Sequence, residues 1–106
     1  MFTTIRQYRC DPSMVSELAH RIDESFAQDI ADQPGFVAYE VIDCGGGDLF
    51  TLSVFSDREA SERTTELATT FIREHLSDLE IERTGLFTGE VVVNRAMRDM
   101  LEMVHA

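Results

Sequence analysis

Two short apolar stretches on either side of a glycine-rich segment form the clearest pattern in the chain. Phe36–Ile42 and Leu49–Phe55 are rich in Val, Phe, Ile and Tyr, and residues 43–48 between them read DCGGGD. Apolar runs separated by such a cluster predict a β-hairpin with a turn that glycine permits. Gln33-Pro34-Gly35 predicts the turn that leads into this hairpin.

The segment before the hairpin predicts a strand followed by a helix. Phe2–Arg9 alternates loosely, as a strand does, and Asp11-Pro12 supplies an N-cap and a first-turn proline. From Ser13 to about Ala31 the pattern predicts an amphipathic helix. Its apolar residues recur every four positions, at Met14, Leu18, Ile22, Phe26 and Ile30.

The segment after the hairpin predicts a second helix and a last strand. Ser56 and Glu59 have the spacing of a capping box, so the helix is expected to begin there and to end near His75. Residues 77–83 form an acidic connector. Leu86–Val93 predicts the last strand, with Gly89 as a candidate bulge.

The C-terminal tail is expected to be separate from the domain. Residues 95–105 place Met97, Met100, Leu101 and Val104 at helical spacing, which predicts a short third helix. We therefore expect one domain over residues 1–94 and a helical tail over residues 95–106. The tail is interpreted either as a lid over a pocket or as a helix packed on a partner subunit.

The order β-α-β-β-α-β is that of the ferredoxin-like α+β fold, with an antiparallel sheet. Both helices of that fold lie on one face of the sheet, so the other face is polar in a monomer. Here the strands carry apolar residues on both faces. In the second strand, Phe36, Ala38 and Ile42 alternate with Val37, Tyr39 and Val41. A homodimer packed sheet against sheet is therefore expected.

The charge of the chain limits its partners. Its 20 acidic residues outnumber 9 basic ones, all of them Arg, which gives a net charge of −11. Such a surface repels phosphate backbones and anionic lipid, so neither nucleic acid nor membrane is an expected partner. Two explanations of the acidity stay open: adaptation to high salt, and codon bias in a GC-rich genome. Without an apolar span or a signal-peptide core, the chain is expected in the cytoplasm.

Several short motifs of the chain resemble one family. These are Pro34-Gly35-Phe36 before a strand, the Gly/Asp hairpin, residues 56–60 (SDREA) opening the second helix, and Gly89-Glu90-Val91 in the closing strand. Together they resemble the dimeric α+β barrel superfamily, and most closely its antibiotic-biosynthesis-monooxygenase-type domains, over residues 2–94. The resemblance implies a cofactor-independent monooxygenase that acts on a small aromatic or quinol compound. The alternative is a non-catalytic small-ligand-binding or stress-associated protein on the same scaffold.

The chain departs from this family in its aromatic residues. Many of the monooxygenases and haem degraders have a Trp in the second helix, where this chain has Phe71 and no Trp at all. The haem degraders also resemble one another in an Asn on the first strand and a His near the second helix. Only His75 corresponds here, so the resemblance does not imply haem degradation.

Four residues are candidates for the site. His75 would be a general base, or simply a favourable residue at a helix C-terminus. Tyr8, Tyr39 and Arg6 stand on predicted strands and would orient a phenolic substrate in a sheet-lined cavity, or else pack ordinarily. No cofactor is expected. No metal site is expected either, because Glu17, His20 and Glu24 share a solvated helix face.

Overall fold

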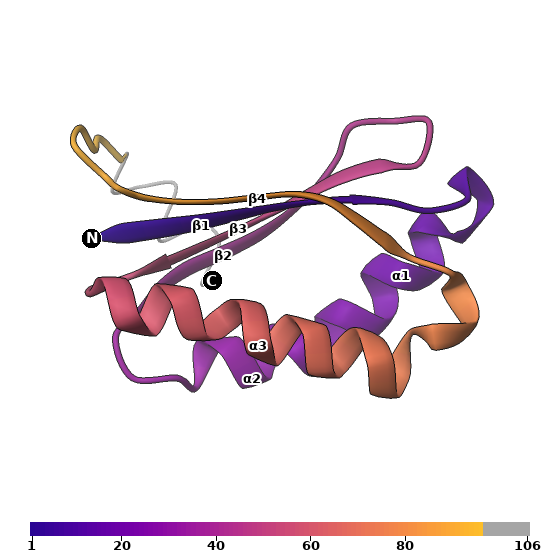
Figure 1. Ribbon diagram of the computed structural model, residues 1–106, viewed down its shortest axis with the longest axis horizontal. Coiled ribbons are helices and arrows are strands. Elements are labelled where there is room, and N and C mark those ends of the chain that lie inside the picture. Colours follow the sequence, from indigo (N-terminus) through magenta and orange to yellow (C-terminus); the bar gives the residue numbers. More distant parts are fainter. Residues whose placement is uncertain (97–106) are drawn as a thin grey trace.

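The computed structural model describes residues 1–96, which form a four-stranded sheet and one layer of helices (Figure 1). The strands are β1 (Phe2–Arg9), β2 (Phe36–Asp43), β3 (Asp48–Phe55) and β4 (Glu82–Glu90). A helical run between β1 and β2 comprises η1 (Pro12–Met14), α1 (Val15–Arg21), η2 (Ile22–Phe26) and α2 (Ala27–Ala31). Between β3 and β4 lie α3 (Arg58–His75) and η3 (Ser77–Leu79).

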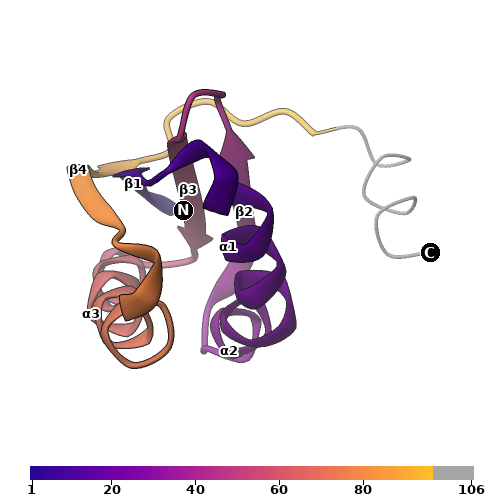
Figure 2. The ribbon, with the colours of Figure 1, turned by 90° about the vertical axis from the view of Figure 1, so that its right-hand side faces the viewer.

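The sheet has the strand order β2-β3-β1-β4, and all neighbouring strands are antiparallel. Seen along the sheet, α3 lies under one half of it and the α1–α2 run under the other (Figure 2). No helix of residues 1–96 lies on the opposite face (Figure 1). The predicted ferredoxin-like α+β fold is therefore confirmed.

The first helix widens in its middle. Its η2 segment is a π-helix, in which the N–H of Ala27 donates to the carbonyl of Ile22. Residues four apart advance by about 400° in an α-helix, so an apolar stripe at this spacing drifts by about 40° per repeat. The wider π turn offsets part of the drift and keeps the stripe on the sheet. The buried stripe is Leu18, Ile22, Phe26 and Ile30, whereas Met14 is exposed.

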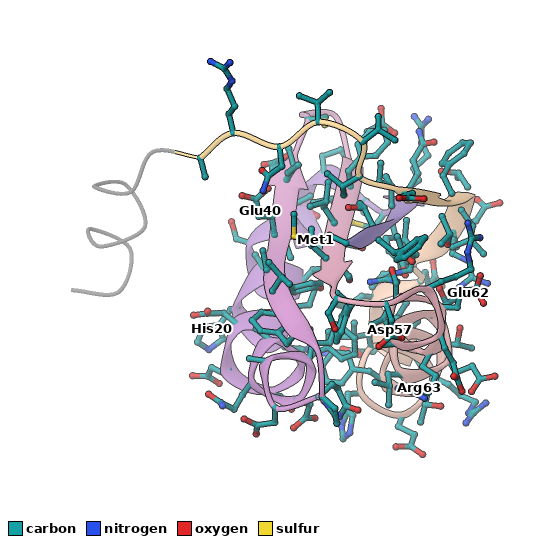
Figure 3. The ribbon with its side chains drawn as sticks, turned by 90° about the vertical axis from the view of Figure 1, so that its left-hand side faces the viewer. Met1, His20, Glu40, Asp57, Glu62 and Arg63 are labelled. Atoms are coloured by element: carbon teal, nitrogen blue, oxygen red, sulfur yellow. The ribbon has the colours of Figure 1, made fainter. Side chains whose placement is uncertain are left out.

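The second helix begins one residue later than the predicted capping box requires. Asp57 is the N-cap of α3, and its Oδ1 accepts a hydrogen bond from the Ala60 N–H at 2.8 Å (Figure 3). Ser56 instead donates its backbone N–H to the Gly35 carbonyl at 2.8 Å, which ties the end of β3 to the turn before β2. The predicted Ser56–Glu59 capping box is thus wrong.

The predicted hairpin forms, but one residue of β2 faces the other way from the prediction. The β2–β3 ladder is irregular between Phe36 and Ala38, so Val37 is an extra residue. Phe36 therefore shares the helix-facing side with Tyr39 and packs its ring on Phe55, with centroids 5.8 Å apart. Grouping Phe36 with Ala38 and Ile42 was wrong because strict alternation does not anticipate a bulge.

The last strand lies earlier than predicted. It is Glu82–Glu90 rather than Leu86–Val93, because its ladder runs along β1 from Arg9 to Phe2, and the Val91 N–H then donates to the carbonyl of Met1, the first residue of the sequence. Gly89 pairs regularly with Thr3, so it is not the bulge; the register shift lies near Gln7 instead. Residues 91–96 have no regular structure, and the rest of the predicted tail helix lies outside the described residues.

The sheet face without helices is mostly apolar. Strand register places Ile5, Phe50, Leu52, Ile42 and Phe87 on it, and Phe87 is 61% exposed. Its charged groups include Glu40 on the edge strand and, at one end, Glu82 and an Arg9–Asp48 ion pair of 3.6 Å. None of the helices within residues 1–96 has the length and hydrophobicity that a membrane crossing requires.

Candidate ligand cavity

A cavity of about 30 Å³ lies between the sheet and the two helical segments. A buried water needs at least about 10–15 Å³, so the cavity holds very few water molecules as it stands. Its accessible walls are almost wholly apolar, although four of the strand residues that line it carry polar groups. These are Arg6, Tyr8, Tyr39 and Thr51.

Arg6 is a fully buried cation, with 0% of its surface exposed. Alternation along β1 turns it toward the helices, two residues from Tyr8. Its Nη1 donates to the Thr64 hydroxyl at 2.8 Å, and its Nη2 donates to the Ser53 hydroxyl at 2.6 Å. No carboxylate of residues 1–96 forms an ion pair with it. Burial lowers the pKa of its guanidinium.

Two polar atoms of this region have no hydrogen-bond partner among the described residues. They are Nε of Arg6 and Oγ1 of Thr51, and both belong to residues that line the cavity. The two residues stand directly opposite each other in the β1–β3 ladder. Thr51 is 4% exposed, so bulk water does not satisfy its hydroxyl. Buried polar groups without partners are rare in native proteins, and this pair lies at one place in the cavity wall.

The two phenols keep their protons well above neutral pH. Burial raises the pKa of Tyr8 and, more strongly, that of Tyr39, and the nearby Arg6 charge offsets only part of this effect. Both side chains therefore stay neutral and can donate a hydrogen bond from their hydroxyls. The cavity then combines one positive charge, two phenols and apolar walls.

A row of rings separates the cavity from solvent. The Phe26 ring lies 5.8 Å from that of Tyr39 and 5.1 Å from that of Phe71, and Phe71 lies 5.1 Å from the imidazole of His75. Phe26 and Phe71 line both the cavity and an outer groove of about 370 Å³. The two phenylalanines thus form the wall between them.

The structure brings together three of the four predicted site residues. Arg6, Tyr8 and Tyr39 line the cavity, whereas His75 lies in the outer grooves with 59% of its side chain exposed. His20, the other histidine of residues 1–96, points to solvent from α1 (Figure 3).

Sequence reasoning missed the hydroxyl residues around Arg6. Thr51 and Ser53 alternate in β3 with Phe50, Leu52 and Val54, which marks one face of this strand as unusually polar. That alternation was the available signal. Thr64 shows no comparable signal, because a threonine on a helical stripe is ordinary.

Comparison with known proteins identifies the fold. No protein-family model and no curated protein sequence matches the chain. Solved structures do: a dimeric ferredoxin-like protein from an uncultured marine organism has a TM-score of 0.70 at 11% identity, covering 91% of this chain and 98% of its own. The chain has the ferredoxin-like fold of these structures. This result confirms the resemblance to the dimeric α+β barrel superfamily at the level of the fold.

Two further structures with this fold belong to proteins of described activity. MhuD from Mycobacterium tuberculosis, a haem degrader with two haems in its active site, has a TM-score of 0.70 at 18% identity, covering 91% of this chain and 100% of MhuD. The monooxygenase ActVA-Orf6 of Streptomyces coelicolor, in complex with nanaomycin D, has a TM-score of 0.63 at 15% identity, covering 90% of this chain and 92% of its own. At these identities the likeness is one of fold.

Proposed function

We propose that the protein binds a small aromatic compound in the cavity between sheet and helices and oxidises it with O₂ in the manner of a cofactor-independent monooxygenase. The observation that carries this proposal is an apolar cavity whose lining residues include one buried cation, Arg6, one buried phenol, Tyr8, and one partly buried phenol, Tyr39. Ligand sites are typically apolar pockets with a few converging polar groups. The monooxygenase with this fold gives the reaction class as an analogy.

The proposed reaction uses O₂ as its oxidant. A phenolic or quinol substrate loses its acidic proton, and the resulting anion transfers electrons to O₂. One oxygen atom then becomes a ring carbonyl, and the other leaves as water with the two displaced hydrogens. For 1-naphthol the balance is C₁₀H₈O + O₂ → C₁₀H₆O₂ + H₂O. The site residues supply orientation and electrostatic stabilisation of the anion.

We assign different roles to the candidate residues. Arg6, Tyr8 and Tyr39 orient the ligand and stabilise its anion inside the cavity. His75 accepts the released proton at the outer side of Phe71. A ring-sized ligand must displace Phe26 and Phe71, because the cavity measures only about 30 Å³. That displacement brings the ligand toward the imidazole, which packs on the Phe71 ring.

A small aromatic substrate requires a much smaller displacement of Phe26 and Phe71 than a porphyrin would, which favours the small substrate. A haem is far larger than about 30 Å³, and neither histidine of residues 1–96 lines the cavity. The alternative function, a non-catalytic small-ligand-binding protein, shares the same cavity. The tight packing of Phe26 against Phe71 supports this alternative, because it leaves little open space in the free protein.

Oxygen uptake separates the two functions. We expect the wild-type protein to consume one O₂ per 1-naphthol converted, with one ¹⁸O atom from ¹⁸O₂ in the quinone product. Tyr39→Phe and His75→Gln should each slow turnover by at least about tenfold, as for loss of a general acid–base or orienting group. Glu62→Gln, on the outer side of α3, is the matched control (Figure 3). Binding without any oxygen uptake would establish the non-catalytic function instead.

We also propose that the protein is a homodimer packed through the helix-free sheet face. The apolar residues of this face need a cover, and a chain with net charge −11 places few charges there. One structure of the same fold is described as dimeric. We propose that residues 95–106 are a segment separate from the domain, either a lid over the cavity or a helix packed on the partner subunit.

A further inference from the structure

The buried charge of Arg6 has no carboxylate counter-charge within residues 1–96. Arg6 is fully buried, yet its hydrogen-bond partners in residues 1–96 are the hydroxyls of Ser53, Thr64 and Thr65. The chain has 20 acidic residues, so the missing carboxylate does not follow from a lack of acids. Burying an unpaired charge costs several kcal/mol of folding free energy. An anion from outside the chain would offset that cost.

The position for such an anion is marked by two unused donors. Nε–H of Arg6 is fixed in the guanidinium plane, and the Thr51 hydroxyl can rotate to donate. Neither atom has a hydrogen-bond partner within residues 1–96, and both residues line the cavity from neighbouring strands. Directly opposed residues on one sheet face have Cβ atoms about 4.5–5.5 Å apart. One acceptor atom placed between the strands can therefore receive both hydrogen bonds.

We propose that Arg6 Nε and Thr51 Oγ1 together bind an anionic oxygen of the ligand, so that the ligand is an organic acid of aromatic size. The oxygen belongs to a carboxylate or to an ionised phenol, which share this chemistry. Charge-assisted hydrogen bonds of this kind are about twice as strong as neutral ones. Thr51 is thereby a binding residue. This inference rests on the proposed function, because it specifies the ligand of the same cavity.

The rest of the cavity suits an anion. Tyr8 and Tyr39 remain neutral, so they add donors without adding negative charge. No Asp or Glu of the described part of the chain lines the cavity. The acidic surface keeps free anions away in general, so the selectivity of the site depends on the cavity itself.

Three small probes test the proposal by calorimetry and absorbance. Benzoate and benzyl alcohol have nearly the same shape but differ in charge, and we expect benzoate to bind at least about tenfold more tightly. 4-Nitrophenol reports its own ionisation by colour, and its pKa should fall by about one unit or more when it is bound beside Arg6. Comparing the affinities of benzoate and 4-nitrophenolate then shows whether the site prefers a carboxylate or a phenolate ligand.

Variants assign the effect to the two donors. Arg6→Met should abolish the preference for benzoate, and Thr51→Val, which keeps the side-chain shape, should weaken benzoate binding by about tenfold while leaving benzyl alcohol unaffected. Thr70→Val in the outer groove is the matched control. If Arg6→Met fails to fold, the wild-type probe comparison and Thr51→Val still decide the question.

The binding results distinguish failure of the anion site from failure of the proposed function. Equal binding of benzoate and benzyl alcohol by the wild type would overturn the anion site and leave the small-aromatic function standing. No binding of any probe would overturn both. Benzoate preference that survives in Thr51→Val would remove Thr51 from the site.

Discussion

The helix-facing side of β1 presents Thr4, Arg6 and Tyr8, where a sheet packed on helices usually presents apolar side chains. The Thr4 hydroxyl lies 2.7 Å from that of Ser61 and 3.1 Å from that of Thr88. These hydroxyls continue the polar contacts of Arg6 toward the start of α3. The interior thus has a polar half under β1 and an apolar half around Phe26.

Alkaline pH should destabilise the protein through its two buried phenols. Burial raises the pKa of Tyr8 and Tyr39, whereas tyrosines of the unfolded chain ionise near pH 10. Above about pH 10 the unfolded state binds fewer protons than the native state, so the free energy of unfolding falls as pH rises. Below that pH the contribution is fully present. Each phenol can cost up to about 1.4 kcal/mol per pH unit.

Urea denaturation at several pH values between 8 and 11 measures this effect. Tyr39→Phe should reduce the fall of the free energy of unfolding with rising pH, because Tyr8 is then the only remaining tyrosine. Glu62→Gln should leave the slope unchanged. Tyrosinate absorbance of the native protein offers an independent readout, since the chain has two tyrosines and no tryptophan. Native tyrosines that titrate near pH 10 would contradict the prediction.

At the scale of elements, the β2–β3 hairpin depends on one glycine more than on its neighbours. Gly47 has φ of 90°, and a Cβ at this position would collide with the carbonyl oxygen of Cys10. The Cys10 N–H donates to the Gly47 carbonyl at 3.0 Å. This hydrogen bond holds the two backbone segments together, so they cannot move apart freely. Gly46 has φ of 65° and open space around it.

A pair of alanine substitutions tests this difference. Gly46→Ala should cost about 1 kcal/mol, the usual cost of a left-handed conformation for an L-residue. Gly47→Ala should cost at least about 2 kcal/mol more, because it adds a backbone collision to the same conformational cost. Chemical denaturation of both variants gives the comparison. Equal losses in the two variants would show that the Cys10 contact is not rigid.

The elements with a strong local signal were predictable, and those set by pairing partners were not. The first strand and the hairpin follow from alternation and from glycine, and they lie where expected. The ends of β4 depend on the length of β1, which local pattern does not contain. The Val37 bulge and the Asp57 cap are likewise decided by contacts between distant segments.

The candidate site likewise has features that the sequence predicts and features that it does not. Arg6, Tyr8 and Tyr39 could be proposed because polar residues in apolar strands are conspicuous, and the fold brings them into one cavity. The sequence does not predict that Phe71 separates His75 from the cavity, since this depends on how the rings of two helices pack. The absence of a carboxylate beside Arg6 in residues 1–96 is also a property of the tertiary structure alone.

At the scale of the whole molecule, the proposed dimer makes the helix-free sheet face the most sensitive surface. Leu52 lies in the middle of this face, opposite Ile5 on one side and Glu40 on the other. Leu52→Glu would bury a carboxylate beside another carboxylate in the dimer, whereas in a monomer the new side chain remains in water. We therefore expect the variant to be a folded monomer at about 10 μM, at which the wild type sediments with the mass of two chains.

Met14→Glu is the matched control, because Met14 is an exposed apolar residue at the start of the first helical run, away from the strands. It should remain a dimer. Sedimentation velocity reports the mass of each protein, and far-ultraviolet circular dichroism verifies that each variant is folded. A monomeric wild type, or a Leu52→Glu variant that still dimerises, would refute packing through this face and leave its apolar residues without an explanation.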